Sequence, residues 1–321
     1  VTGVQTCALP IFCEMFLGPL AISHYSDQPI SRTLRSWPEG IPIEVATSLL
    51  PMCSRFNMGM LLHIHLQSKI SKQTSQQIEK PGGSRKVNPS PIVENLKRTV
   101  SKLAAPTRGS VWTSYYNEID KRGDYIDDKK SIVERWIREI GSVESALDVG
   151  SNEGYFSRLL PASCRIVSID ADANVIDRIY TTDRTNTKND QESNILPLVM
   201  DLCDLSAGQG LLNQERATFT DRGGFDLVLA LALIHHLLIG RQVPMNAVAE
   251  LLSSLSSNWL IVEFVPMGDP WAQKLLEAKK GNVHRYDQNS FEQHLAGHFQ
   301  ILEKCAIVAS GRWLYKLQKL T

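Results

Sequence analysis

The spacing of apolar residues changes along the chain and predicts two different regions. In IPIEVATSLLP (41–51), apolar side chains recur at Val45, Leu49 and Leu50, which is the spacing of one helix face. Prolines interrupt the early region repeatedly, at Pro19, Pro38, Pro42 and Pro51. Residues 12–68 are therefore predicted to form a small, mostly helical N-terminal region of short helices.

A polar segment follows this region. Residues 69–108 include SKQTSQQIEKPGGSRKVNPSP, in which polar residues, Pro and Gly replace the apolar pattern. Such composition is typical of a linker. We therefore expect a second domain to occupy residues 109–321.

From residue 109 onward, helical patterns alternate with short apolar runs. DDKKSIVERWIREI (127–140) places Val133, Trp136 and Ile140 on one helix face. Five runs follow that are apolar on consecutive residues, as in strands covered on both faces: SALDV (145–149), RIVSID (165–170), ILPLVM (195–200), FDLVLALAL (225–233) and NWLIVEFV (258–265). Helix-like segments at 173–180 and 243–255 separate several runs, so the rhythm predicts a parallel sheet with right-handed crossovers.

The end of the chain has a different pattern. FQILEKCAIV (299–308) and RWLYKLQK (312–319) are strand-like and flank Ser310-Gly311. Two strands joined by so short a connection predict a terminal antiparallel hairpin.

Composition narrows the class of protein. Hydrophobic residues make up 43% and charged residues 21%, as in soluble globular proteins. Lys plus Arg total 34 and Asp plus Glu total 34, so no general attraction to nucleic acid is expected. The six cysteines form no Cys-x-x-Cys pair, which argues against a zinc site and indicates a reducing, cytoplasmic setting. No apolar run reaches the roughly 18 residues of a membrane span.

The first residues require a separate interpretation. VTGVQTCALPI (1–11) resembles a translated sequencing adapter, so we expect an artefact joined to a truncated native N-terminus, and a fragment of the native protein. The alternative is a secretory signal, because residues 7–22 are rather apolar. That stretch lacks a basic start, however, and Glu14 interrupts it.

A glycine-containing loop follows the first predicted strand. It runs from Asp148 to Gly154 as DVGSNEG and is followed by a predicted helix, YFSRLL. Glycines allow sharp turns and close approach to a ligand, and a helix N-terminus offers unpaired N–H groups. Asp170, twenty residues after Gly150, suits the ribose hydroxyls of an adenosine ligand. The alternative is that the loop is only a tight turn between a strand and a helix.

Two substitutions disfavour a dinucleotide. The fingerprint G-x-G-x-x-G would place glycines where this chain has Asn152 and Tyr155. Asp148 adds a carboxylate that opposes a pyrophosphate and suits a ligand ammonium, as in the methionine part of S-adenosylmethionine. The hypothesis of a nicotinamide-dependent oxidoreductase is therefore disfavoured.

Four segments in order carry a family resemblance: DVGSNEGYFSRLL, SIDAD, LVMDLCD and FDLVLALALIHHL. They resemble the successive motifs of class I S-adenosylmethionine-dependent methyltransferases. HHLLIGRQVPMNAVAELLSSLSSNWLIVEFVP and FEQHLAGHFQILEKCAIVASGR are similar to a bacterial group related to nodulation-protein methyltransferases, as are FLGPLAISH and EGIPIEVATSLLP. The resemblance implies S-adenosyl-L-methionine as cofactor. It also implies an α/β fold, a doubly wound Rossmann-like methyltransferase sheet with a terminal antiparallel β-hairpin.

The resemblance further implies a set of cofactor contacts. Asp170 would hold the ribose hydroxyls, Asp201 the adenine amino group, and Asp148 the methionine amino group. Asp201 and Asp204 could instead cap a helix. The implied contacts are Asp148, Gly150, Ser151, Asn152, Gly154, Asp170, Asp201, Leu202, Ala230 and Leu231.

Three residues are candidates for the chemistry. His235 and His236 follow the fourth predicted strand, at the edge where open-sheet sites lie. Glu263 lies among apolar residues of the fifth strand, where a carboxylate requires a partner. Each could act as a base or orient the substrate. The alternatives are structural histidines beside the cofactor and an ion pair for Glu263.

Two other groups leave alternatives open. His63 and His65 in LLHIHL could bind a metal, but no third ligand lies nearby in the sequence, so no metal is predicted. Aromatic residues before the second domain could cover the cofactor or pack against its first helix: Trp112, Tyr115, Tyr116 and Tyr125.

The sequence therefore predicts a methyltransferase that acts on a small-molecule or glycan acceptor, with O-methylation favoured and no nucleic-acid partner. The alternative is a non-catalytic methyltransferase fold that binds cofactor or a partner. The acceptor and the oligomeric state are not determined by these patterns, because acceptor pockets come from variable loops, such as TTDRTNTKNDQESN (181–194).

Overall fold

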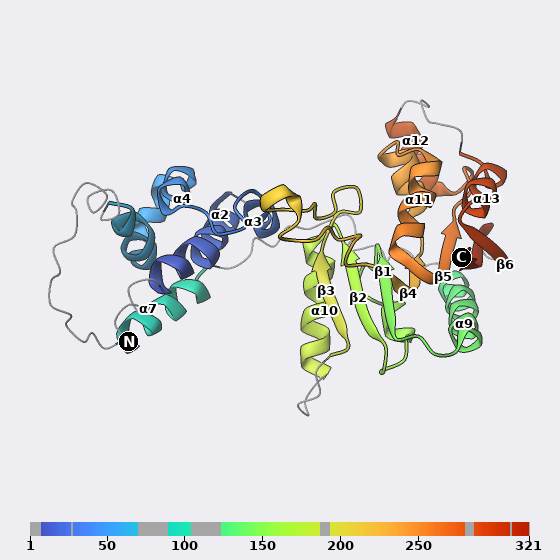
Figure 1. Ribbon diagram of the computed structural model, residues 1–321, viewed down its shortest axis with the longest axis horizontal. Helices are drawn as coiled ribbons and strands as arrows, with labels where there is room; N and C mark the ends of the chain where they lie inside the picture. Colours follow the sequence, from blue (N-terminus) through green and yellow to red (C-terminus); the bar gives the residue numbers. More distant parts are fainter. Residues whose placement is uncertain are drawn as a thin grey trace. The chain divides into compact units, whose positions relative to one another are not determined.

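The computed structural model describes residues 8–26, 28–69, 89–103, 123–186, 193–279, 286–308 and 310–320. The chain divides into two compact units, Val1–Arg108 and Gly109–Thr321 (Figure 1). Each unit has a buried apolar core of its own.

The first unit is helical, as predicted. Its elements are short because prolines precede several of them, and α4 begins directly after Pro42. Leu17, Met60 and Ile64 are fully buried in its core. The elements are η1 (Cys13–Leu17), α2 (Gly18–Ser26), α3 (Ile30–Ser36), α4 (Ile43–Leu49), η2 (Met52–Phe56), α5 (Met58–Met60), η3 (Leu61–Leu66) and α7 (Ser90–Ser101).

Helix α7 corrects the prediction of a continuous polar linker over 69–108. Leu96 and Val100 pack against the core of the first unit, and Thr99 is buried. A Cβ at Gly59 would lie 1.8 Å from Thr99 Oγ1, so this glycine allows α5 and α7 to approach closely. The apolar positions of α7 have helical spacing, but the polar residues around them made the segment resemble a linker. Residues 70–88 and 104–108 lie outside the described residues.

The segment interpreted as an adapter is described from Ala8 onward, where a helix runs continuously to Ser26. By length and composition this helix could cross a membrane, with a mean hydropathy of 1.2. Only 33% of its most apolar window is buried. Buried core helices of soluble proteins and signal sequences meet the same criteria.

The second unit is built on a seven-stranded sheet in the order β3-β2-β1-β4-β5-β7-β6. The first five strands pair in parallel, while β7 is antiparallel to both β5 and β6. The predicted fold class is therefore confirmed, including the terminal hairpin. The strands are β1 (Ser145–Val149), β2 (Arg165–Asp170), β3 (Ile195–Val199), β4 (Phe225–Ala230), β5 (Ser256–Phe264), β6 (Phe299–Ile307) and β7 (Arg312–Lys319).

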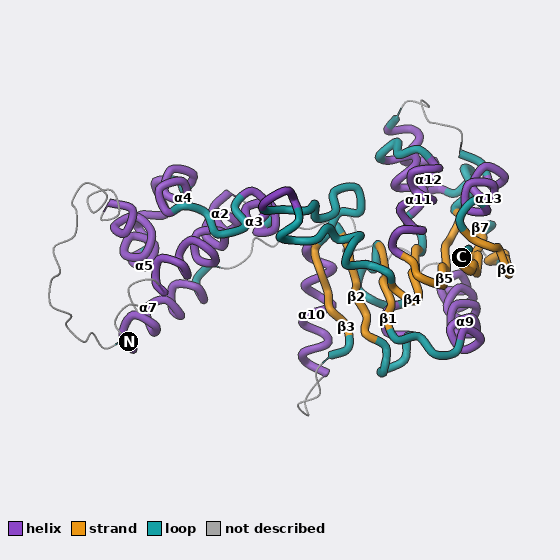
Figure 2. The backbone as a smooth tube through the Cα atoms, in the orientation of Figure 1, coloured by secondary structure: helices purple, strands orange, loops and turns teal. Residues whose placement is uncertain are grey.

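Helices cover both faces of this sheet, which explains its consecutive apolar residues (Figures 1 and 2). On β1, Leu147 and Val149 join one core with α11 (Met245–Leu255). Ala146 points to the other face of the strand and joins the core on that face of the sheet. That core includes α9 (Gly123–Ile140) and α10 (Ala173–Asn186). Two further helices, α12 (Pro270–Ala278) and α13 (Gln288–Ala296), pack with the first core.

Strand β4 is shorter than predicted. It ends at Ala230, and Ala232 adopts a left-handed conformation with φ of 52°. The backbone therefore turns away from the sheet before Leu233. The carboxyl ends of β1, β2, β3 and β4 share one edge, where open α/β sheets place their ligands.

Candidate functional site

A cavity of about 360 Å³ lies at this edge of the sheet. Eight of the ten implied cofactor residues line it: Asp148, Gly150, Ser151, Asn152, Asp170, Asp201, Leu202 and Leu231. Gly154 and Ala230 do not line it. Ala230 is fully buried within β4, and a Cβ at Gly154 would point toward Ile179 of α10.

The loop after β1 departs from the predicted strand–helix unit. Gly150, Asn152 and Gly154 have φ values of 71°, 48° and 73°. These left-handed residues are incompatible with an α-helix, so a turn follows β1 and ends in the single 3₁₀ turn η6 (Ser157–Leu159). The expected N-terminus of an α-helix is therefore absent from this described segment.

The N–H groups of the loop are already bonded within the protein. Two donate to one β2 carbonyl, one donates to the Asp170 carboxylate, and two close turns inside the loop. A pyrophosphate would need such donors free, so the loop geometry opposes a dinucleotide. The bonds are Gly150 to Ile169 O (2.9 Å), Ser151 to Ile169 O (3.0 Å), Asn152 to Asp170 Oδ2 (3.0 Å), Glu153 to Asn152 Oδ1 (2.8 Å) and Gly154 to Ser151 O (2.9 Å).

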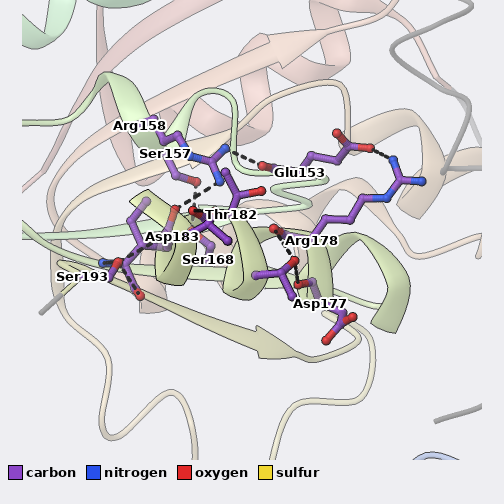
Figure 3. Close-up of polar contacts among 12 residues, drawn as sticks. Glu153, Ser157, Arg158, Ser168, Asp177, Arg178, Thr182, Asp183 and Ser193 are labelled. Atoms are coloured by element: carbon purple, nitrogen blue, oxygen red, sulfur yellow. Dashed lines mark hydrogen bonds and ion pairs between the residues drawn. The ribbon is translucent and has the colours of Figure 1, made fainter. Parts of the chain in front are cut away.

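Helix α10 holds the outer side of the loop (Figure 3). Arg158 Nη1 donates to the carbonyl oxygen of Glu153 at 2.6 Å, and its Nη2 lies 3.3 Å from Asp183 Oδ1. Arg178 pairs with the side chain of Glu153. These contacts fix the loop from outside, while its inner side faces the cavity.

Asp148 is a buried carboxylate in the cavity wall. Its side chain is held by Ser157, whose hydroxyl donates to Oδ2 at 2.6 Å. Burial raises the pKa of Asp148 to about 6, against this hydrogen bond and the nearby Lys129. A positively charged ligand group would offset that cost.

Ser151 adds an unsatisfied group to the same wall. The residue is 5% exposed, and its Oγ has no hydrogen-bond partner among the described residues. A buried hydroxyl without a partner is costly, so this atom is available to a ligand.

Asp170 ends β2 and faces the cavity. Oδ2 accepts the Asn152 N–H, and Oδ1 accepts the Asp172 N–H at 2.9 Å. Burial raises the pKa of Asp170, while these backbone bonds oppose the shift. Each carboxylate oxygen has a further lone pair, so the side chain can accept two ligand hydroxyls.

Asp201 follows β3 and is engaged on both oxygens. Oδ1 accepts the Cys203 N–H at 2.9 Å, and Arg241 Nη2 donates to Oδ2 at 2.7 Å. Asp201 therefore caps a turn. The alternative prediction was that it caps a helix, but no helix follows this turn. Leu202 is 8% exposed and lines the cavity beside it.

The two adjacent histidines are separated by the structure. His236 lines the cavity, whereas His235 is 1% exposed and lies outside it. Their ring centroids are 4.0 Å apart. Burial, assisted by Arg312, lowers the pKa of His236 to about 4, so its imidazole is neutral at pH 7. His235 instead matches the structural alternative.

Glu263 was predicted as a base or as a residue that orients the substrate, but it does not line the cavity. Oε2 lies 2.6 Å from Lys129 Nζ, and Oε1 lies 3.2 Å from Arg312 Nη1. Burial opposes its charge, but the two cations outweigh this effect and lower the pKa of Glu263. Tyr125 also donates to Oε1 at 2.7 Å. The ion-pair alternative therefore holds.

This buried cluster contains cavity residues that the sequence prediction missed or left open. Tyr125 lines the cavity, as does Lys129 one helical turn later. Lys129 was overlooked, although it lies four residues before Val133 on the apolar face of α9. A lysine among the apolar positions of a helix face was the signal in the sequence that could have identified it. Arg241 and Leu275 were also missed, because distant segments bring them to the cavity.

The other predictions have separate outcomes. His63 Nε2 lies 2.8 Å from Asn95 Oδ1, and His65 Nε2 lies 2.8 Å from Ser54 Oγ. Both histidines are buried with protein partners, and no group of three metal-binding side chains occurs among the described residues. Trp112, Tyr115, Tyr116 and residues 187–192 lie outside the described residues.

Comparison with known proteins shows that the chain is similar in sequence to a nodulation protein. No protein-family model matches the chain. It is 26% identical over 317 residues to nodulation protein NoeA of Rhizobium meliloti (strain 1021). The match covers 96% of this chain but 65% of that protein, so the chain spans slightly less than two thirds of its relative. The predicted similarity to a nodulation-related group is confirmed by this match.

Solved structures give weaker likenesses. The N-methyltransferase NodS from Bradyrhizobium japonicum WM9 has a TM-score of 0.44 and 13% identity, covering 61% of this chain and 97% of its own. Magnesium protoporphyrin IX methyltransferase (ChlM) from Synechocystis PCC 6803, solved with bound SAH, has a TM-score of 0.42 and 14% identity, covering 73% of this chain and all of its own (100%). Similarity at this level leaves the function to the residues of the site.

Proposed function

We propose that this chain is an S-adenosylmethionine-dependent methyltransferase. The observation that carries the proposal is the set of groups in the cavity wall. Asp148 favours a cation, Ser151 Oγ has no described partner, and Asp170 can accept two hydroxyls. The loop N–H groups are internally bonded, which disfavours a phosphate ligand. An adenosine joined to an amino acid fits these requirements together.

The cofactor residues have distinct roles in this proposal. Asp148 attracts the amino group, Asp170 holds the ribose, and Leu202 packs against the adenine. Asp201 contributes through its turn and its pair with Arg241. Ala230 and Gly154 act through the backbone, by ending β4 and by shaping the loop.

Small-molecule or glycan acceptors are proposed, with oxygen as the favoured acceptor atom. When bound, the cofactor supplies a methyl group on a positively charged sulfur. A hydroxyl must lose its proton as it accepts that group. His236 lines the cavity as a neutral imidazole, so it can accept a hydrogen bond from this hydroxyl and take its proton. The balanced net charge, 34 basic against 34 acidic residues, argues against a nucleic-acid acceptor.

Calorimetric titration tests cofactor binding. S-adenosylmethionine and S-adenosylhomocysteine should bind at micromolar or tighter Kd, whereas NADH should not bind. Asp170→Asn should weaken both adenosine ligands, and Asp177→Asn, on the exposed side of α10, should leave them unchanged. Binding of NADH alone would overturn the proposal.

Transfer of radiolabelled methyl to fractionated bacterial metabolites and glycans separates an enzyme from a non-catalytic binding module. His236→Ala should reduce transfer about 100-fold, the usual contribution of a general base, with little change in cofactor Kd. If cofactor binds but no fraction accepts the label, the non-catalytic alternative is favoured.

A further inference from the structure

A buried lysine in the cavity wall has no part in the contacts proposed above. Lys129, on α9, is 3% exposed and lines the cavity. Its Nζ lies 2.6 Å from Glu263 Oε2 and 4.6 Å from the centre of the Phe156 ring. Burial lowers the pKa of Lys129, while the ion pair with Glu263 opposes this shift and favours the charged form. The cavity therefore presents a positive group at a defined position.

Pairing with Glu263 leaves binding capacity on Lys129. An ammonium group has three N–H donors. Glu263 Oε1 already accepts from Tyr125 and Arg312, and Arg312 Nε donates to Asp269 Oδ2 at 2.9 Å. Glu263 thus binds Lys129 through Oε2 and holds it at the cavity wall.

The neighbours of Lys129 indicate which ligand group it meets. Lys129 and Asp148 are close enough for each charge to influence the other. Both line the cavity, so groups of opposite charge face it, Asp148 from β1 and Lys129 from α9. An α-amino acid carries the matching pair, an ammonium and a carboxylate.

We propose that Lys129 binds the α-carboxylate of the cofactor's amino-acid end, while Asp148 takes its ammonium. The inference rests on the proposed function. Glu263 is then a positioning residue, because it acts on the ligand only through Lys129.

The strand order favours the cofactor over an anionic acceptor. The three carboxylates come from adjacent strands: Asp201 follows β3, Asp170 is the last residue of β2, and Asp148 lies on β1. A ligand with adenine near β3 and ribose near β2 places its amino-acid end near β1. Lys129 lies toward the same end of the ligand, away from β3. Its partner Glu263 belongs to β5, which follows β1 and β4 in the strand order.

Calorimetry with three ligands tests this assignment. S-adenosylhomocysteine carries the carboxylate, its decarboxylated analogue lacks only that group, and 5′-methylthioadenosine lacks the whole amino-acid end. The wild-type chain should bind S-adenosylhomocysteine at least about tenfold more tightly than the decarboxylated analogue, a difference of about 1.4 kcal/mol. Equal affinities would overturn the proposal without any variant.

Lys129→Met should remove this preference. It should weaken S-adenosylhomocysteine about tenfold and change the Kd of the decarboxylated analogue less than about threefold. Lys130→Met is the matched control, because that lysine pairs with Glu134 at the surface. Equal weakening of both ligands, or of neither, contradicts a carboxylate contact.

The outcomes separate the two proposals. If wild-type protein binds none of the three ligands, the proposed function fails, and this inference fails with it. If it binds S-adenosylhomocysteine but Lys129→Met leaves the preference intact, only the inference fails. Glu263→Gln should reduce the preference partly, since Lys129 remains but loses its charged partner.

Discussion

At the residue scale, Asp148 lies where its charge is unfavourable. The residue is 2% exposed, and burial raises its pKa from 3.8 to about 6. A raised pKa means that the folded protein favours the protonated carboxyl. The stability contributed by this group is complete below about pH 3.8 and is lost as the pH rises through about 6. A carboxylate that opposes folding at neutral pH is typical of a binding site.

Asp148→Asn should therefore stabilise the ligand-free protein at neutral pH and weaken cofactor binding. We expect Tm to rise by on the order of a few degrees at pH 8, because the cost of the charge is removed. The gain should shrink toward pH 4. Thermal melts across this pH range measure the effect.

Asp177→Asn serves as the control, since that residue is exposed on α10. A Tm difference for Asp148→Asn that does not vary with pH would contradict the role assigned to its charge.

At the element scale, the loop after β1 depends on its packing against α10. Gly154 has φ of 73°, and a Cβ there would lie 3.2 Å from Ile179 Cδ1. Gly141, after α9, has φ of 83° and no atom within 4 Å of such a Cβ. Both glycines have a left-handed backbone that would be strained with a side chain, but their surroundings differ in packing.

Alanine substitution at these glycines separates the two effects. Gly141→Ala should cost about 1–2 kcal/mol, because a left-handed conformation is unfavourable for alanine. Gly154→Ala should cost more, since Ile179 must also move, and should weaken S-adenosylhomocysteine binding. Urea unfolding and calorimetry measure both quantities. Equal losses of stability would mean that packing against α10 adds nothing.

At the scale of the whole molecule, each compact unit has its own buried core. The cavity is lined by residues of the second unit alone. A ligand should therefore stabilise one unit selectively.

Differential scanning calorimetry should resolve two unfolding transitions. S-adenosylhomocysteine at about 100 times its Kd should stabilise the second unit by about 2.7 kcal/mol and leave the other transition in place. A single transition that shifts as a whole would show that the units unfold together.

Much of the second unit follows from local sequence. Consecutive apolar residues in β1, β2 and β5 predict strands covered on both faces, because such residues must be buried on both sides. The left-handed positions at Gly150 and Gly154 explain the glycines of the loop. The strand ends also predict the cavity wall, since parallel strands bring their carboxyl ends to one edge.

Only the tertiary structure decided how the polar side chains are paired. Neither Glu263 nor Lys129 reveals its partner locally, because 134 positions along the chain separate them and packing brings them within 2.6 Å. The same holds for His235 and His236, which are adjacent in sequence but differ in access to the cavity. Helix α7 was hidden for a related reason, since its apolar face is stabilised by the core of the first unit. Local sequence determines strands and turns, whereas charge pairing and access depend on distant residues.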